Sequence, residues 1–499
     1  MSGWNTWLPM LVLGTSLVTG AIIFCMPESW RRARTALNVS GATLKAGLVA
    51  DMVWGVFHGQ RYETRLGLGL GPGLELVLSS DSLSMLFATL SSLLWLVTTL
   101  YAVGYLEGTH HLRRFFGFFS LCVTATMGIS FAGNPITFLL FYELLTVSTY
   151  PLVVHEGTDE ALRAGRVYLR YTLTGGAVLF LAVAWLYALA GPVAFTVGGV
   201  LAGLGLGRGE AVGLFALFIA GLGVKAALVP LHGWLPAAMV APAPVSALLH
   251  AVAVVKAGAF GIVRVVYDVF GVRYAQSLGV TDPLAALAAF TILYGSVRAL
   301  SQQNLKRRLA YSTVSQVSYI VLGIAIVGPV STVAALSHLV HQGLMKITLF
   351  FCAGSLGKGL HIHEVNELKG AGRRMPWTMA AFSVGALGMM GVPPVAGFVT
   401  KWYLGLGAVS ERGQSWALWV LVGSTVLNAT YFLPLLKMAW FDAPDAEHAG
   451  PAPRWEGHPL LLFPLLATAL LSLVVGLLAH SPISPLSWAW LISQREFRP

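Results

Sequence analysis

Long apolar runs separated by short polar segments repeat along almost the whole chain. Runs of about twenty apolar residues are long enough to cross a bilayer as a helix. They predict about fourteen transmembrane helices, near residues 7–26, 35–57, 82–106, 115–132, 135–154, 166–190, 211–231, 243–267, 283–303, 310–327, 331–355, 378–403, 415–440 and 459–479. The 35–57 run contains Lys45 and Asp51, and the Gly-rich stretch 193–206 is either a half-span or a surface hairpin.

The composition agrees with a membrane protein. Of 499 residues, 56% are hydrophobic and only 10% are charged, and the mean hydropathy is +0.74. Soluble domains carry about a quarter charged residues. Because lipid cannot hydrogen-bond a bare backbone and the runs show no strict alternation, we expect helices rather than strands. Cys25, Cys122 and Cys352 stand singly, in no spacing that suits a disulfide framework or a zinc site.

Basic residues gather in loops that follow the odd-numbered spans. These residues are Arg31, Arg32, Arg34, Arg113, Arg114, Arg163, Arg166, Arg170, Lys306, Arg307, Arg308 and the bases between Lys358 and Arg374. The formal net charge of +10 could suggest nucleic acid, but short clusters between apolar runs are typical of cytoplasmic anchoring charges. The positive-inside rule therefore predicts that the N-terminus lies outside. We expect the membrane to be a bacterial-type inner (plasma) membrane.

Five ionisable side chains lie inside apolar runs, where a charge costs about 2.5–3.5 kcal/mol on insertion scales. They are Glu143, Lys225, Lys256, Lys346 and Lys401. One carboxylate cannot pair with four lysines, so the excess amines must be solvated by internal water or be partly neutral. A lysine whose charge depends on a movable glutamate is a proton switch, whereas the alternative for each one is a fixed ion pair or snorkelling to the interface.

Histidines accompany the lysine at 346. His338, Gln342 and Lys346 recur every four residues, which places them along one helix face about 6 Å apart, with His341 beside them. Imidazole both accepts and donates a proton near neutral pH. The stripe therefore indicates a proton relay, although a single buried histidine is more often a satisfied interior hydrogen bond.

Two spans are interrupted by helix breakers. Pro230 follows Lys225 closely, and Gly391, Pro393 and Pro394 precede Lys401. Proline frees a backbone carbonyl, and such sites persist in membranes only when they are buried in protein or line a cavity. Interrupted helices in both halves of a chain are typical of transporters with inverted repeats, and a packing kink is the alternative.

Five motifs resemble, in order, those of the antiporter-like membrane subunits shared by Mrp-type cation/proton antiporters, respiratory complex I and membrane-bound hydrogenases. They are LLFYELLTVSTYPL (139–152), GVKAALVPLHGWLPAAMVAPAPVSALLHAVAVVKAGAFG (223–261), NLKRRLAYSTVSQVSYI (304–320), HQGLMKITLFFCAGSL (341–356) and GVPPVAGFVTKW (391–402). Coverage runs from about residue 80 to about 440.

The resemblance implies an all-α membrane protein with two inverted five-helix repeats, two broken helices and a hydrated axis of charges across mid-membrane. It divides the chain into residues 1–110 (first three helices), 111–270 (first repeat), 271–440 (second repeat) and 441–499 (loop, last helix and tail).

The same resemblance assigns an order to the interior groups. Glu143 and Lys225 would be the coupled pair of the first half, Lys256 with His250 the bridge, and Lys346 and Lys401 the relay and exit of the second. The chain looks most like the Mrp D subunit. Gln342 departs from the family, which usually has a histidine four residues before the lysine of that helix, and His341 is the candidate substitute.

We therefore expect a proton-translocating subunit, with or without cation antiport, that works with other membrane subunits, needs no cofactor and performs no redox chemistry of its own. An intramembrane haem or quinone enzyme is the alternative, since His250 and His338 could in principle ligate haem. A lipid-modifying transferase would need paired carboxylates. Only Asp159 and Glu160 offer them, and these residues indicate a solvated helix start.

Overall fold

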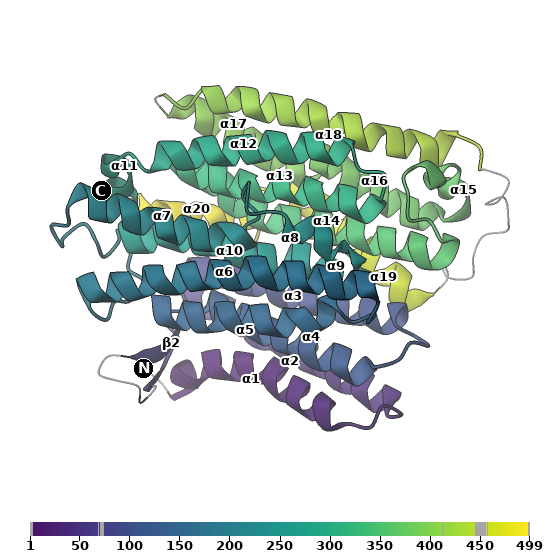
Figure 1. The fold of residues 1–499 in the computed structure, drawn as a ribbon, viewed down its shortest axis with the longest axis horizontal. Helices are drawn as coiled ribbons and strands as arrows, with labels where there is room; N and C mark the ends of the chain where they lie inside the picture. The colour runs from purple at the N-terminus through teal and green to yellow at the C-terminus, as the bar shows by residue number, and fades with distance from the viewer. Residues whose placement is uncertain are drawn as a thin grey trace.

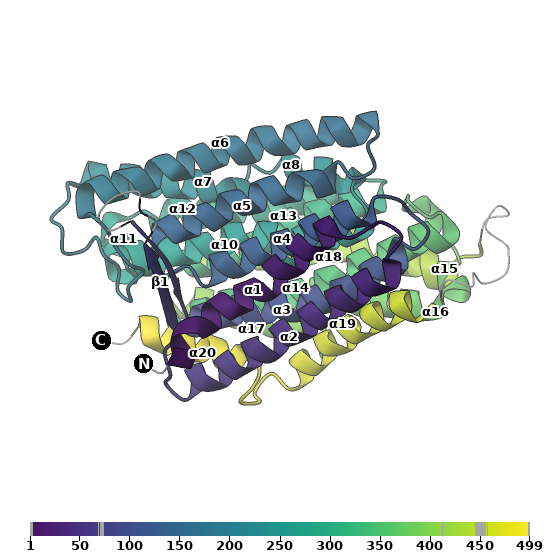
Figure 2. The ribbon, with the colours of Figure 1, turned by 90° about the horizontal axis from the view of Figure 1, so that it is seen from below.

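The computed structural model describes residues 3–67, 69, 74–411, 413–444, 456 and 458–497. Long helices lie side by side along one direction, and the connections gather at the two ends of the bundle (Figure 1). Both chain termini lie at the same end, at the left of Figure 1, and the view from below keeps them there (Figure 2). We refer to this as the terminal end of the bundle.

The elements follow the chain in this order. The first half contains α1 (Gly3–Cys25), α2 (Arg31–Phe57), β1 (Glu63–Gly67), β2 (Glu75–Ser79), α3 (Ser82–Tyr105), α4 (Leu112–Ser130), α5 (Pro135–Val153), α6 (Asp159–Ala190), α7 (Arg208–Lys225), α8 (Trp234–Ala237), the 3₁₀ turn η1 (Ala238–Val240), α9 (Ala243–Ala247), the π-helical η2 (Leu248–Val252), α10 (Val254–Arg264) and the π-helical η3 (Val265–Phe270).

The second half contains α11 (Val272–Leu278), α12 (Thr281–Leu300), α13 (Leu305–Ala325), α14 (Pro329–Leu360), the 3₁₀ turn η4 (Asn366–Leu368), α15 (Ala371–Arg374), α16 (Pro376–Met390), α17 (Ala396–Ser410), α18 (Trp416–Phe441), α19 (Pro459–Leu477) and α20 (Pro485–Glu496).

The prediction of an all-α membrane fold is confirmed. Ten helical stretches within the described residues are long and apolar enough to cross a membrane. The four other predicted ranges correspond to α2, α7, α13 and the α16–α17 pair. These helices are not among the ten because polar residues lower their hydropathy or because a break shortens them. The count of fourteen spans and the inverted repeats stay predictions.

Polar residues between the apolar runs start several helices. A side-chain oxygen accepts a hydrogen bond from the backbone N–H three residues later, which satisfies a donor that the first turn leaves free. These N-caps are Asp81 for α3, Asn134 for α5, Thr158 for α6 and Asn304 for α13. Asp159 and Glu160 lie in the first turn of α6, as expected of a helix start.

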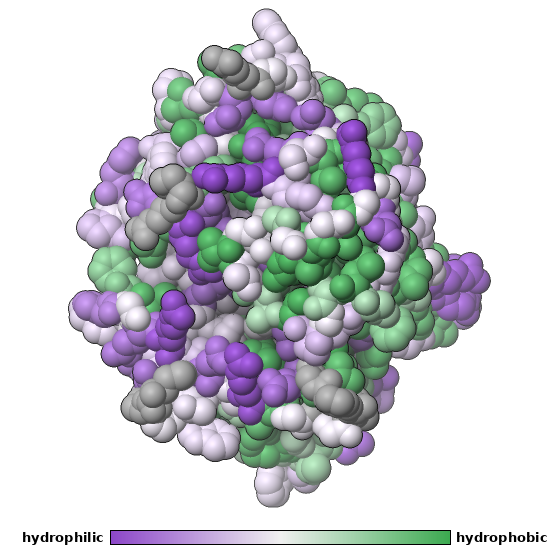
Figure 3. Space-filling model, turned by 90° about the vertical axis from the view of Figure 1, so that its left-hand side faces the viewer, coloured by the Kyte–Doolittle hydropathy of each residue, from purple (hydrophilic) through white to green (hydrophobic). Residues whose placement is uncertain are grey.

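The terminal end carries two irregular features. β1 and β2 form an antiparallel hairpin in which Glu63 pairs with Ser79. The Gly-rich stretch 193–206 holds neither a helix nor a strand, so both predictions for it, a half-span and a hairpin, are wrong. It packs as a loop over the end of η3, where Val200 N donates to Val269 O at 2.9 Å. Hydrophilic side chains are scattered over much of this face (Figure 3), as suits a membrane boundary.

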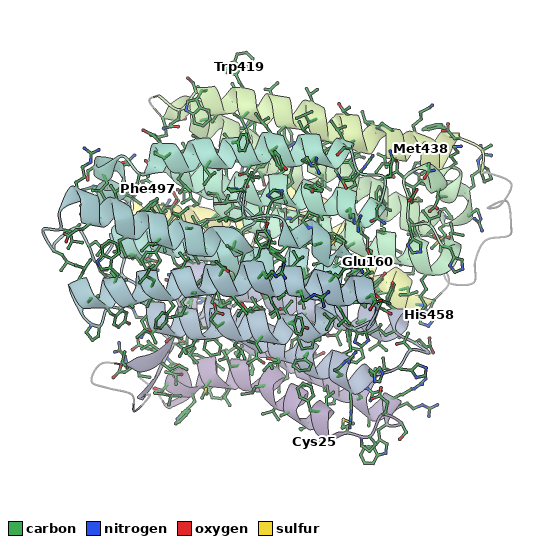
Figure 4. All side chains as sticks on the ribbon, in the orientation of Figure 1. Cys25, Glu160, Trp419, Met438, His458 and Phe497 are labelled. Atoms are coloured by element: carbon green, nitrogen blue, oxygen red, sulfur yellow. The ribbon has the colours of Figure 1, made fainter. Side chains whose placement is uncertain are left out.

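Two helical stretches form the centre of the bundle. The apolar windows of 243–270 and of α14 are completely buried. Helices at the periphery expose apolar side chains instead, and Trp419 of α18, 76% exposed, points away from the bundle (Figure 4). The expected lipid-facing surface is therefore peripheral. The two central stretches carry Lys256 and Lys346.

Candidate functional site

The helix that carries Lys225 is broken immediately after that residue. α7 ends at Lys225, residues 226–233 are not helical, and α8 begins at Trp234. Pro230 lies within this break. Trp234 Nε1 donates to the carbonyl oxygen of Val224 at 2.7 Å, so the indole supplies a partner to a carbonyl at the end of the helix.

Lys225 is fully buried and points at α5. Its ammonium group donates to the backbone carbonyl of Tyr142 and lies 3.3 Å from the centre of the Tyr142 ring. The adjacent residue is Glu143, whose Oε1 is buried without a hydrogen-bond partner among the described residues. A Cβ atom at Gly176 of α6 would clash with this carboxylate. The structure thus brings Glu143 and Lys225 to one place, with the lysine bound to the neighbouring residue rather than to the carboxylate.

A third irregular helix, which the sequence did not signal, separates His250 from Lys256. His250 lies in η2, and Ala253, with φ −119° and ψ −79°, interrupts the helix before α10. The imidazole ring packs against Phe350 of α14 with 4.5 Å between ring centres, and neither ring nitrogen has a partner in the described part of the chain. Such π-helical segments are frequent at functional sites.

Lys256 connects α10 to α14. It is fully buried, and its ammonium group donates to the carbonyl of Leu339 at 2.8 Å. Leu339 follows His338, whose ring nitrogens are buried without partners from the residues that the structure describes. Lys256 therefore ends beside the predicted histidine stripe of α14.

Two residues of the predicted stripe on α14, His338 and Lys346, contact α13. Lys346 donates to Ser312 Oγ at 2.7 Å and to Leu309 O at 3.2 Å, both on α13. His338 lies against Tyr319 of the same helix, with ring centres 5.3 Å apart. Between these two residues, the side-chain amide atoms of Gln342 are buried and find no partner among the described side chains and backbone.

His341 points in another direction, toward α17. Its Nδ1 lies 2.8 Å from Thr400 Oγ1, and its Nε2 has no partner within the described ranges. Thr400 precedes Lys401, so His341 approaches the last lysine of the series rather than taking the place of Gln342 in the stripe.

Lys401 lies at the second break. α16 ends at Met390, α17 begins at Ala396, and Gly391, Pro393 and Pro394 lie between them. Gly391 has a φ of +86°, a left-handed conformation that glycine adopts without strain. The Lys401 ammonium donates to Met390 O at 2.9 Å and to Thr425 Oγ1 of α18 at 3.0 Å, so this lysine supplies a donor to the last carbonyl of α16.

Two tyrosines join the groups of the second half. The Tyr319 ring, already in contact with His338, lies 5.8 Å from the Lys401 ammonium. Tyr431 of α18 donates to Ser312, the partner of Lys346, at 2.8 Å. The groups near 338, 346 and 401 thus share one interior region between α13, α14, α17 and α18.

The four lysines that the sequence analysis singled out, Lys225, Lys256, Lys346 and Lys401, have the same kind of partner, whereas Lys45 of α2, which is also buried, donates to Ser16 Oγ at 2.6 Å. Each donates to a backbone carbonyl, of Tyr142, Leu339, Leu309 or Met390 respectively. None of the ion pairs found among the described residues includes one of these lysines. Neutral acceptors bind an ammonium ion or an amine without fixing the charge. Such an arrangement suits a group that gains and loses a proton.

The structure also shows polar residues of the candidate site that the sequence analysis missed. Tyr142, Tyr319, Tyr431 and Ser312 contact the lysines or their partners, and Gln316 is buried with both amide atoms unpartnered among the described residues. Unsatisfied buried polar atoms need hydrogen-bond partners, and water is the usual one. A sequence signal exists only for the residues within the motifs at 139–152 and 304–320, because hydroxyl groups on apolar helices carry no charge that marks them.

Comparisons with known proteins agree with this geometry. A family model described as NADH:quinone oxidoreductase/Mrp antiporter, TM, matches residues 132–428. NADH-quinone oxidoreductase subunit N of Desulforudis audaxviator is 34% identical over 431 residues, which is 83% of each chain. Hydrogenase-4 component B of Escherichia coli is 33% identical over 344 residues, 66% of this chain and half of that longer protein.

The fold is also that of a solved structure. A chain in the structure of the Mrp complex from Dietzia sp. DQ12-45-1b superposes with a TM-score of 0.86 at 23% identity, covering 100% of this chain and 98% of the other. The chain belongs to the NADH:quinone oxidoreductase/Mrp antiporter family of membrane subunits.

Proposed function

We propose that this chain moves protons across the membrane as one subunit of a multisubunit Mrp-type antiporter or of a complex I-like or hydrogenase-like complex. Family membership supports the proposal, because the relatives are a subunit of an NADH-quinone oxidoreductase and a component of a hydrogenase. The fold of an Mrp complex chain supports it as well.

One observation carries the proposal. Four lysines, on α7, α10, α14 and α17, are held inside the bundle by carbonyl groups. α7 packs against α10 and α14 packs against α17, and the Lys256 hydrogen bond connects α10 to α14. Ionisable groups inside a membrane are expensive and usually mark ion pathways. Hydrogen bonds to backbone carbonyls do not neutralise the charge of these lysines, so a structural role alone does not explain why four of them lie inside the membrane.

The proposed route begins at Glu143 and Lys225. A proton on Lys225 is stabilised while the carboxylate is near and is released when the carboxylate moves away. Lys256 with His250 bridges the halves. The second half then uses His338, His341 and Lys346, and it ends at Lys401, with buried amide and imidazole atoms as sites for connecting water.

The architecture that we propose has fourteen spans and two inverted repeats, at residues 111–270 and 271–440, between end segments 1–110 and 441–499. The breaks after Lys225 and Met390 support the repeats, because each half contains one. A broken helix in each half is the usual place for an ion site.

The proposed orientation puts the terminal end outside a bacterial plasma membrane. The basic loops support it, because they lie at the opposite end of the bundle, near the labelled Glu160 and His458 and away from Phe497 (Figure 4). There Arg307 pairs with Glu160 at 3.2 Å. Basic loops are retained in the cytoplasm.

The redox alternative is not favoured. A haem with two histidine ligands needs imidazole rings that face each other across an open space. The rings of His250 and His338 are instead covered by Phe350 and Tyr319, respectively.

Substitution of the first pair tests the proposal. In the complete complex in sealed vesicles, Glu143→Gln or Lys225→Ala should lower proton flux by about a hundredfold while the complex still assembles, because each removes a proton-binding group. Lys437→Ala is the control, since that side chain is 72% exposed. Unchanged flux in both variants would overturn the proposal.

A second measurement separates antiport from uncoupled proton transfer. Proton flux in the same vesicles is followed with and without a sodium or potassium gradient. A proton flux that reverses direction with the cation gradient supports cation/proton exchange. A proton flux that neither cation changes restricts the chain to proton transfer driven by a redox partner.

A further inference from the structure

A second cluster of ionisable groups lies at the terminal end, outside the row of lysines. Asp81, Arg264, Asp268, Arg495 and Glu496 meet there from the start of α3, the α10–η3 helix and α20. α20 is anchored beside them, because Trp488 Nε1 donates to Ser82 O at 2.7 Å and Ser493 Oγ to Pro329 O at 2.8 Å. None of these residues was singled out by the sequence motifs.

Arg264 is the centre of the cluster and is only 2% exposed. Its Nη1 donates to Asp81 Oδ2 and to Asp268 Oδ2, both at 2.7 Å. Its Nη2 donates to Asp81 Oδ1 at 3.0 Å and to Ser84 Oγ at 2.8 Å. The guanidinium is therefore shared by two carboxylates.

Arg495 and Glu496 of α20 complete the cluster. Arg495 Nη1 lies 3.3 Å from Asp81 Oδ2, and Arg495 Nε lies 3.6 Å from Glu496 Oε1. The Glu496 side chain is only 2% exposed. Three carboxyl groups thus share two guanidinium groups, which leaves one negative charge uncompensated within the described cluster.

Two buried carboxyl oxygens point into this cluster without a partner among the described residues. They are Asp268 Oδ1 and Glu496 Oε2. An unpaired anionic oxygen in such a place is unfavourable, and a proton on one of these carboxyl groups removes both the excess charge and the missing donor. We infer that the cluster is a proton-binding site at the terminal end of the molecule, with Glu496 as the group that takes up and releases the proton.

The electrostatic surroundings of Glu496 support this assignment. Burial, together with the negative charge of Asp268 and Asp81, raises the pKa of Glu496 to about 8, although Arg495 and Arg264 oppose the shift. Tyr267 of η3 is a further ionisable neighbour, and its hydroxyl group bonds to Thr332 of α14.

The pKa of Asp81 is shifted in the opposite direction to that of Glu496. Burial favours its neutral form, but the charge and hydrogen bonds of Arg264 outweigh burial and hold its pKa well below the usual range. Asp81 therefore stays ionised, and the exchangeable proton belongs to Glu496 with Asp268.

The inference rests on the proposed function, to which it adds a loading or release site. Arg264 follows Lys256 by eight residues, about 12 Å along the helix. Phe260 lies between them in the sequence and packs against Phe87 of α3, with ring centres 4.9 Å apart. Because this aromatic pair is apolar, the cluster exchanges protons with the aqueous face directly and with Lys256 only when water enters the helix interface.

The test uses the complete complex in vesicles, with proton flux recorded between about pH 6 and about pH 9.5 on the terminal side. The range brackets the raised pKa of Glu496, which is about 8. Wild-type flux should show a transition near that pH. Glu496→Gln should remove the transition and lower flux about tenfold, because it removes one proton-transfer group. Glu496→Asp should restore the transition, which a purely structural role for the side chain would not require.

An infrared titration identifies the proton directly. The infrared difference spectrum between wild type and Glu496→Gln at pH 7 should contain the band of a protonated carboxyl group. This band should vanish as the pH rises above about 8. Asp282→Asn is the control, because that carboxyl group is exposed at the start of α12. Neither measurement should respond to it.

Lys225→Ala, measured in parallel, separates the two proposals. If Lys225→Ala abolishes flux while Glu496→Gln changes neither the pH profile nor the infrared band, the cluster is structural and only this inference fails. If neither variant affects flux, the proposed function fails as well.

Discussion

At the scale of single residues, the position of the buried groups depends on small neighbours as much as on the groups themselves. Glu143 has space for its carboxylate because Gly176 on the neighbouring helix has no side chain. The same carboxylate has an oxygen without a partner among the described residues, so it is not held in place by a hydrogen bond to that atom. A carboxylate with space and without a fixed partner suits a group that must move.

Gly176→Ala tests this arrangement. The added methyl group should displace the carboxylate and lower proton flux about tenfold or more, since misplacement by about 1 Å is enough for a large loss. Gly47→Ala is the matched control, because a methyl group added to that α2 glycine would meet no described atom within 4 Å. Equal flux in the two variants would show that the position of Glu143 is not critical.

Tyr319 is the second residue on which the arrangement depends. Its ring lies between His338 and Lys401, at 5.3 Å and 5.8 Å respectively. Tyr319→Leu should reduce proton flux about tenfold, because it removes the ring that positions both proton-binding groups. Tyr319→Phe keeps the ring and should retain most of the flux. Flux is measured per assembled complex, and a wild-type rate in the leucine variant would exclude the ring from the pathway.

At the scale of elements, the broken helices are stabilised by side chains that satisfy freed backbone groups. Trp234 donates to the carbonyl of Val224 at the first break, and Lys401 donates to that of Met390 at the second. An unpaired carbonyl in a membrane interior is expensive. The second break therefore makes the lysine both a structural donor and a proton-binding group.

Trp234→Phe tests how much the hydrogen bond at the first break contributes to the stability of the protein. It removes this donor, while the Val224 carbonyl keeps its bond from the Ala227 N–H at 3.1 Å, and should destabilise the protein by about 0.5–1.5 kcal/mol. The thermal unfolding midpoint in detergent should fall accordingly. Trp419→Phe, at a residue that is 76% exposed, should leave the midpoint unchanged. An identical midpoint for both variants would mean that another group satisfies the carbonyl.

At the scale of the whole molecule, the cluster around Arg264 connects parts of the chain that are remote in sequence. Arg264 and Asp81 are separated by 183 residues, and α20 joins them from the last described segment. The terminal end is thus fixed by charge as well as by packing. The interior lysines, in contrast, bond to neutral acceptors.

Arg264→Met should destabilise the complex by about 3–5 kcal/mol at pH 7, because the buried carboxylates lose their counter-charge. The depressed pKa of Asp81 gives the sign of the pH dependence. Its stabilising effect is present above the ordinary pKa of about 3.9 and is lost as the pH falls through the lower folded-state value.

The difference in unfolding midpoint between the wild type and Arg264→Met should therefore narrow as the pH is lowered, since the variant can protonate its carboxyl groups. Arg65→Met, in an exposed hairpin pair, is the control and should have little effect at any pH. A difference that stays constant as the pH falls below about 4, the ordinary pKa of aspartate, would contradict this account.

Much of the molecule could be predicted because the relevant signals are local. Runs of apolar residues determine where helices form in lipid, and prolines and glycines near 230 and 391–394 indicate where they break. A charged residue within an apolar run is visible without any structure. The spacing of His338 and Lys346 predicted a common face, and both contact α13.

Other features depended on residues that packing brings together. The irregular helix at Ala253 has no breaker in its sequence, and the loop at 193–206 was predicted wrongly because glycine-rich apolar segments fit several conformations. The spacing did not show that His341 points toward Thr400. Polar residues such as Asp81 and Arg495 carried no signal, since each lies near a helix end where charges are common.

The amino-acid sequence alone determined that this protein is a helical membrane protein with costly ionisable groups at known positions, because hydropathy and helix breaking are properties of short segments. Only the tertiary structure decided the partners of those groups. Lys225 and Lys256 each reach a carbonyl 83 residues away, and the Glu496 cluster draws on three distant segments. The physical reason is that the charge state of a buried group depends on every neighbour within a few ångströms, and packing rather than sequence order selects those neighbours.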